Sequence, residues 1–152
     1  MYDTILVPTD GSTVAETAVE HAIDVADTYD ADVHALYVID VSAIDVSIGG
    51  EQVQRIKDGQ FDEMPELEQR ATEALAAVTD RADERGLAVT ETIATGRPHR
   101  EITEYATEND ADLIVMGSAG RSGVRRALLG SVAERTLRTA TIPVLVVDAR
   151  ED

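Results

Sequence analysis

Short apolar runs alternate along the chain with longer stretches in which apolar residues recur every three or four positions. The short runs predict buried strands, and the longer stretches predict amphipathic helices. Five strands are expected in this way, in residues 4–8, 32–40, 87–96, 111–117 and 142–148. Four helices are expected between them, in residues 12–30, 63–85, 97–110 and 131–140.

Strands that alternate with helices of this length pair in parallel through right-handed crossovers. Most of the strands are nearly continuous apolar runs, which is typical of a sheet covered by helices on both faces. The chain of 152 residues therefore predicts one α/β domain, a doubly wound, Rossmann-like sheet of five parallel strands. Residues 41–62 contain Gly49-Gly50 and show no period, so we expect an irregular insertion there.

The composition argues against several kinds of chemistry and several classes of partner. The chain has no cysteine, which excludes disulfides and thiolate chemistry, and no apolar run long enough to span a bilayer. We therefore expect a cytoplasmic protein. Its net charge of −17 argues against nucleic acid and anionic membranes as partners. Lys57 is the only lysine, and an acidic chain almost without lysine resembles the proteins of salt-accumulating halophiles.

The stretch MGSAGRSGVRRALLGSVAE, residues 116–134, is the strongest candidate for chemistry. It follows the fourth strand, and ligands of open α/β sheets bind at the carboxyl ends of strands. Its spacing Gly117-x2-Gly120-x9-Gly130-Ser131 matches neither the P-loop nor the dinucleotide fingerprint. Glycines and a following helix N-terminus are nevertheless suited to holding an anion through backbone N–H groups.

A purely structural explanation competes with the anion site. Ser131 and Glu134 have the spacing of a capping box, which would satisfy the same N–H groups without a ligand. Thr13 and Glu16 repeat that spacing at the first helix. The residues alone leave both explanations open.

The chain resembles the universal stress protein family over nearly its whole length. The resemblance is carried by ILVPTDGS, YVID, GRPHREI and, most specifically, residues 114–147. The Gly117-x2-Gly120-x9-Gly130-Ser131 spacing is similar to that of the branch of the family that binds ATP. The resemblance thus favours the anion site over the simple cap.

The resemblance implies a nucleoside pocket made by the ends of three strands. Val38 would face the adenine, and Asp10 would bind a ribose hydroxyl. The remaining residues implied around the nucleoside are Pro8, Thr9, Met116 and Gly117.

The resemblance also implies a phosphate site, with Mg²⁺ or Mn²⁺ bridging the phosphate oxygens of ATP. The residues implied there are Gly120, Arg121, Gly130, Ser131 and Val132. Ala119 is a departure, because many relatives carry histidine at that position. The family further implies a homodimer formed through the last strand, IPVLVVD.

The residues do not offer an obvious set of catalytic groups. Asp10 is the only carboxylate that the pattern places in the site, and His21, His34 and His99 are expected to be structural or surface residues. We therefore expect a nucleotide-dependent switch that acts on an unknown protein partner. A slow ATPase or autophosphorylating phosphotransferase is the second hypothesis, and a dimerisation module without nucleotide is the third.

Overall fold

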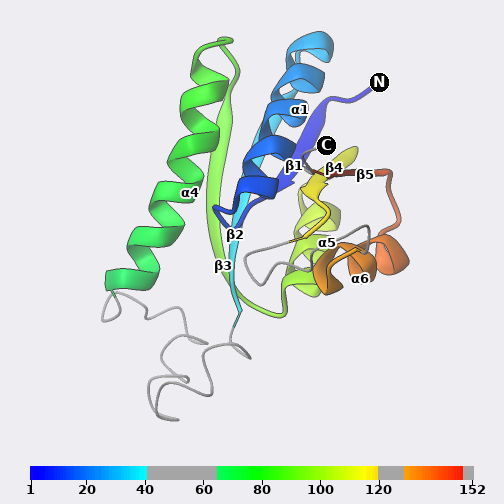
Figure 1. Cartoon of the computed structure of the whole chain (residues 1–152). Helices are drawn as coiled ribbons and strands as arrows, with labels where there is room; N and C mark the ends of the chain where they lie inside the picture. Colours follow the sequence, from blue (N-terminus) through cyan, green and yellow to red (C-terminus); the bar gives the residue numbers. More distant parts are fainter. Residues whose placement is uncertain (41–64, 120–128, 149–152) are drawn as a thin grey trace.

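Five parallel strands form a single sheet in the order β3-β2-β1-β4-β5 (Figure 1). The computed structural model describes residues 1–40, 65–119 and 129–148. The predicted insertion at residues 41–62 lies outside these described residues. The strands are β1 (Thr4–Pro8), β2 (Asp32–Asp40), β3 (Val89–Gly96), β4 (Leu113–Gly117) and β5 (Val144–Val147). The predicted doubly wound parallel sheet is therefore confirmed.

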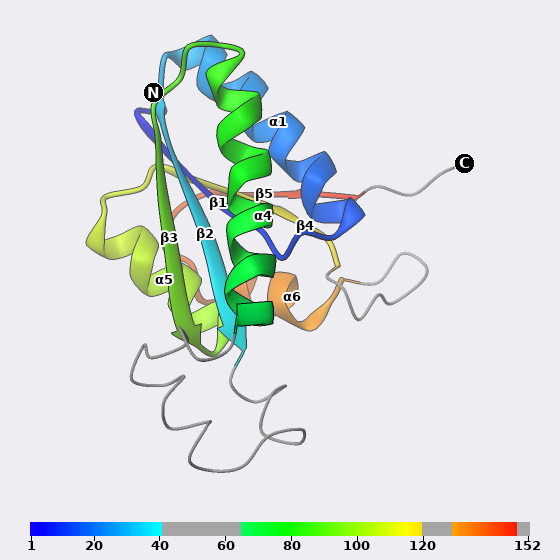
Figure 2. The ribbon, with the colours of Figure 1, turned by 90° about the vertical axis from the view of Figure 1, so that its left-hand side faces the viewer.

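Helices cover both faces of the sheet, as the continuous apolar strands predict. The described helices are α1 (Thr13–Tyr29), α4 (Pro65–Asp83), α5 (Pro98–Glu108) and α6 (Ser131–Thr139). Figures 1 and 2 show α1 and α4 on one side of the sheet, and α5 and α6 on the other. Each helix or strand end differs from its expected position by at most a few residues.

Two apolar clusters hold these layers together, one on each face of the sheet. Ile5 and Val7 point into the cluster beneath α1 and α4, whereas Leu6 points into the cluster beneath α5 and α6. This alternation follows from the period of two in a strand. All three side chains are fully buried, so the first strand anchors both halves of the core.

Small residues allow α1 to lie close to the sheet. Its buried face is largely alanine, with Ala18, Ala22 and Ala26 inaccessible to solvent. At the end of β4, a Cβ added to Gly117 would lie 2.8 Å from Cγ1 of Val14 and 3.2 Å from its carbonyl carbon. Gly117 thus permits the first turn of α1 to pack directly on β4, which fixes where β4 ends relative to α1.

Candidate functional site

The central feature of the site is the meeting of β1 and β4 in the middle of the sheet. Ile5 pairs with Leu113 and Leu6 with Ile114, so the two strands run side by side towards the same edge. In the sheet, β2 and β3 lie on one side of β1, and β4 and β5 lie on the other side. The carboxyl ends of β1 and β4 therefore form the switch point at which open α/β sheets bind ligands.

The turn after β1 is held by its own polar side chains. The N–H of Thr9 donates to the carbonyl oxygen of Leu36 at 2.9 Å, which ties the turn to β2. The N–H of Gly11 donates to Oγ1 of Thr9 at 3.1 Å, and the N–H of Ser12 donates to Oδ1 of Asp10 at 2.9 Å. Asp10 thus lies at the strand end where it was expected, with one carboxylate oxygen already shaping the turn.

The predicted capping box at Thr13 and Glu16 is wrong by one residue. Ser12 is the N-cap of α1, and its Oγ accepts from the N–H of Ala15 at 3.2 Å. Thr13 is already the first helical residue. Serine and threonine are both good N-cap residues, so the sequence alone does not decide which of Ser12 and Thr13 caps the helix.

The predicted capping box at Ser131 and Glu134 is also wrong. Gly130 is the N-cap of α6, and it forms no side-chain cap. Its carbonyl oxygen accepts the first helical bond, from the N–H of Glu134 at 3.0 Å. Ser131 is the first residue of the helix and is exposed. The cap that would have competed with an anion for the first N–H groups of α6 is therefore not formed.

Gly130 is held against the end of β4. The N–H of Gly130 donates to the carbonyl oxygen of Ser118 at 2.7 Å. The N–H of Ser118 in turn donates to the carbonyl oxygen of Val147 at 2.8 Å. A Cβ added to Gly130 would lie 3.2 Å from Cα of Ala119 and 3.3 Å from the carbonyl oxygen of Ser118. Glycine thus allows the N-terminus of α6 to approach β4 closely, which presents its N–H groups at the switch point.

Three predicted nucleoside and phosphate residues share one face of the sheet. Met116 belongs to the apolar cluster beneath α5 and α6, and Val38 and Val132 pack against that cluster while remaining partly exposed. Pro8 and Thr9 are buried at the end of β1. The structure thus brings apolar side chains from β2, β4 and α6 together near the switch point. Gly120 and Arg121 lie outside the described residues.

Two polar residues at this edge were missed by the sequence analysis. Oγ of Ser118 donates to Oδ1 of Asp148 at 3.3 Å, which places a second carboxylate beside the end of β4. The available signal was that Asp148 directly follows the last apolar strand, just as Asp10 follows the first. Its position became clear only from the pairing of Gly117 with Val147.

Burial perturbs one carboxyl group where β3 leads into α5. The pKa of Glu101 is raised above its ordinary value of 4.5, first by burial and then by the negative charge of Glu104. A Cβ added to Gly96 would clash with the Glu101 side chain. The φ of +148° at Gly96 is a backbone conformation that favours glycine, whereas the flexible Glu101 side chain could move aside.

His34 has the structural role that was expected for it. Its Nδ1 lies 2.7 Å from the hydroxyl of Tyr105, which in turn lies 3.1 Å from Oγ1 of Thr92. This network joins β2 and β3 to α5. His99 is the second residue of α5, where a surface position was expected.

Comparisons with known proteins agree with this architecture. Residues 1–148 match the universal stress protein family. The chain belongs to the universal stress protein family. It is 43% identical over 148 residues to universal stress protein MJ0531 of Methanocaldococcus jannaschii, covering 97% of this chain and 82% of that one.

Solved structures of relatives share the fold over nearly all of both chains. The structure of MJ0577, from the same organism, has a TM-score of 0.77 and 29% identity, with 100% of this chain and 99% of that chain covered. A universal stress protein in complex with cAMP has a TM-score of 0.69 and 27% identity, with 98% of each chain covered. The second relative thus binds an adenine nucleotide.

Within the described residues of this universal stress protein, no group of three or more His, Cys, Asp or Glu side chains is placed to hold a metal ion. None of the described helices has the length and apolar character needed to cross a membrane.

Proposed function

We propose that this universal stress protein binds ATP at the switch point between β1 and β4. The observation that carries the proposal is the N-terminus of α6. Gly130 begins that helix without a side-chain cap and is held at the end of β4 by the Ser118 carbonyl. The first N–H groups of a helix and its positive dipole end stabilise phosphate groups. Ser131 and Val132 supply the next two N–H groups of this turn.

The nucleoside would occupy the neighbouring apolar surface. Val38 and Met116 present side chains on the face covered by α5 and α6, where an adenine ring would gain contact area. Asp10, at the end of β1, is the group we assign to a ribose hydroxyl. The relative in complex with cAMP supports an adenine nucleotide as the ligand class.

We further propose that Mg²⁺ or Mn²⁺ accompanies the phosphates. The two carboxylates near the site, Asp10 and Asp148, come from different strand ends and do not form a metal-binding cluster. Phosphate oxygens would therefore be the main ligands, with one of these carboxylates as an additional one. When bound, the ion would offset the repulsion between the phosphates and a chain of charge −17.

The experiment that tests nucleotide binding starts from protein purified without added nucleotide, in about 2 M KCl to screen its charge. The protein is denatured and the released small molecules are identified by chromatography. Near-stoichiometric ATP would support the proposal. Protein that releases no nucleotide and also fails to bind added ATP would contradict it.

We propose that ATP acts as a switch rather than as a substrate that is rapidly consumed. Bound phosphates would stabilise the first turn of α6, so amide hydrogen exchange at Val132 and Ala133 should slow in the presence of ATP. Turnover should stay below about one per minute, far under the roughly 10 s⁻¹ of a typical enzyme. Faster sustained turnover, or unchanged exchange in α6, would contradict the switch.

The exposed position of Ser131 favours a second candidate, a slow autophosphorylating phosphotransferase. Ser131 is not the N-cap, so its hydroxyl is not committed to the helix terminus. Intact-mass measurement after incubation with ATP would detect an added phosphate. The mass increase should disappear in Ser131→Ala if this hydroxyl is the acceptor.

We also propose a homodimer formed through β5, which is an edge strand of the sheet. Leu145 on this strand is 37% exposed, and an exposed apolar edge favours pairing with a second chain. Sedimentation analysis should give a dimer for the native chain and a monomer for Leu145→Lys. A native chain that sediments as a monomer would contradict the proposal.

A further inference from the structure

Ser118 is the first residue after β4, and its hydrogen bonds reach both β5 and α6. Its N–H donates to the carbonyl oxygen of Val147 at 2.8 Å, and its carbonyl oxygen accepts from the N–H of Gly130 at 2.7 Å. Its hydroxyl donates to Oδ1 of Asp148 at 3.3 Å. One residue therefore holds the end of β4 to β5 and the start of α6 to β4.

The bond between the Ser118 hydroxyl and Asp148 has a buried donor and a charged acceptor. Ser118 is 8% exposed, and both burial and a charged acceptor strengthen a hydrogen bond. Asp148 is exposed, however, and 3.3 Å is long for a bond between two oxygen atoms. We therefore expect the hydroxyl to make a moderate contribution rather than a large one.

The same bond extends the connection between β4 and β5 beyond their ladder. Gly117 and Val147 are the last residues of the two strands to pair. Asp148 follows Val147, so its contact with Ser118 lies one residue further along both strands. Strand ends fray when nothing holds them. The hydroxyl thus restricts the Ser118 peptide, whose carbonyl oxygen holds Gly130.

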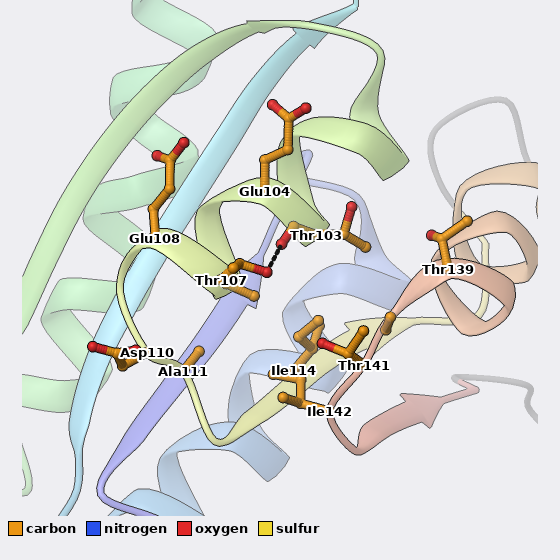
Figure 3. Close-up of a pocket in the computed structure, with 12 residues that line it drawn as sticks. Thr103, Glu104, Thr107, Glu108, Asp110, Ala111, Ile114, Thr139, Thr141 and Ile142 are labelled. Carbon is orange, nitrogen blue, oxygen red and sulfur yellow. Dashed lines mark hydrogen bonds between the residues drawn. The ribbon is translucent and has the colours of Figure 1, made fainter.

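The two ends of α6 are packed to different degrees. At the N-terminal end, a Cβ added to Gly130 would lie 3.3 Å from the carbonyl oxygen of Ser118, so the helix approaches β4 closely. At the C-terminal end, a groove of about 470 Å³ lies between α6 and α5, with Thr139 on one side and Thr103 and Thr107 on the other (Figure 3). The position of the first turn of α6 therefore depends on the contact with Ser118.

We propose that Ser118 is a positioning residue of the ATP site, because its hydroxyl, bonded to Asp148, orients the peptide that holds the first turn of α6. This inference rests on the proposed function, in which ATP phosphates bind at that turn. Ser118 acts through the N–H groups of Ser131 and Val132 and does not itself bind the phosphates. The nucleoside, which we place mainly at the ends of β1 and β2, does not depend on the position of α6.

The test is calorimetric titration of the full-length, nucleotide-free protein with ATP and with adenosine, in the presence of Mg²⁺ and about 2 M KCl. Ser118→Ala removes the hydroxyl and keeps both backbone bonds. It should weaken ATP binding about fivefold, the loss expected for one hydrogen bond of moderate strength. Adenosine has no phosphates, so its affinity should stay at the native value. Ser118→Thr keeps a hydroxyl and should restore most of the ATP affinity.

A double-mutant cycle tests whether Asp148 is the partner through which the hydroxyl acts. Asp148→Ala also removes a negative charge near the phosphates, but that effect is common to both arms of the cycle and cancels. In the Asp148→Ala background, Ser118→Ala should therefore leave the ATP affinity nearly unchanged. A loss of the same size in both backgrounds would overturn the proposal.

The matched control is Ser12→Ala, which removes the hydroxyl that caps α1 after the neighbouring strand β1. It should lower the thermal midpoint and keep native ATP affinity, which separates positioning from a general loss of stability. Native ATP affinity in Ser118→Ala, an equal loss of adenosine affinity, or an equal loss of ATP affinity in the control would overturn this inference alone. A native chain that binds no ATP would overturn the proposed function and this inference with it.

Discussion

At the residue scale, Thr136 is the exception among the described residues whose side-chain nitrogen or oxygen atoms are buried. Its side chain is fully buried beneath α6, and its Oγ1 has no hydrogen-bond partner among the described residues. A buried hydroxyl without a partner loses its hydration and gains nothing in return. Thr136 therefore lowers the stability of the fold.

Thr136→Val should raise the free energy of unfolding by about 1 kcal/mol, since it replaces the hydroxyl with a methyl group of similar shape. Urea denaturation followed by circular dichroism would measure the change. The control is Thr139→Val on the same helix, which is exposed and donates to the carbonyl oxygen of Arg135. A destabilised Thr136→Val variant would show that the hydroxyl has a partner after all.

A second prediction at this scale concerns Glu101 and the pH dependence of stability. Its pKa is raised in the folded chain, so the folded state binds this proton more tightly than the unfolded state. Its contribution to stability is therefore present below the unfolded value near 4.5 and is lost as the pH rises through the folded value. Glu101→Gln should accordingly raise the thermal midpoint at pH 7. It should also make the midpoint fall less steeply as the pH rises above 4.5. If the thermal midpoint of the variant depends on pH as steeply as that of the native chain, the raised pKa of Glu101 is refuted.

At the element scale, the helices that follow β1 and β4, the two strands of the switch point, start in different ways. α1 is capped by the Ser12 side chain, whereas the N-cap of α6 is Gly130, which forms no side-chain cap. In α1 a side chain of the helix's own N-cap accepts from an N–H group of the first turn. In α6 no side chain does so, and the N–H groups of its first turn can receive a ligand. This contrast is the structural basis for placing the phosphates at α6 rather than at α1.

Alanine substitutions should reveal that contrast. Ser12→Ala should cost about 1 kcal/mol of stability because it removes the N-cap. Ser131→Ala should leave stability nearly unchanged, since alanine is well tolerated as a first helical residue. Thermal unfolding of both variants without nucleotide would measure the difference. Equal losses would mean that Ser131 does cap its helix, as its spacing from Glu134 first indicated.

The sequence predicted the elements better than their ends. Apolar periodicity located every described strand and helix, because burial against a sheet imposes that periodicity. The caps were misplaced by one residue, since Ser12-Thr13 and Gly130-Ser131 each offer two acceptable N-cap residues. The place of Asp148 beside the end of β4 could not be predicted, because it depends on which strand pairs with β4.

At the scale of the whole molecule, the net charge of −17 opposes compaction. The ion pairs that join α4 to α1, such as Arg81 to Glu20 at 2.7 Å, are exposed and contribute little individually. Burial of the two apolar clusters must therefore provide most of the stability that outweighs the repulsion between surface charges. A salt-rich environment, which we propose for this protein, would reduce that repulsion.

The thermal midpoint at pH 7 should rise between about 0.1 M and 2 M KCl, as the Debye length falls from about 10 Å to a few ångströms. Scanning calorimetry at several KCl concentrations would measure the rise. Near the isoelectric point of about 4.3 the net charge vanishes, so the dependence should be much weaker there. A midpoint that is flat or falls with salt at pH 7 would contradict the proposed salt-rich environment.

The central claim is that ATP is held at the N-terminus of α6, and the most direct measurement is the ATP affinity of Gly130→Ala. The added Cβ would lie 3.2 Å from Cα of Ala119 and 3.3 Å from the carbonyl oxygen of Ser118, so these atoms and the helix terminus must move apart by a few tenths of an ångström. We predict ATP binding by the native chain, with at least about a tenfold loss in Gly130→Ala. Thr139→Ala, at the other end of α6, should retain native affinity. Native affinity in a folded Gly130→Ala variant would contradict the account.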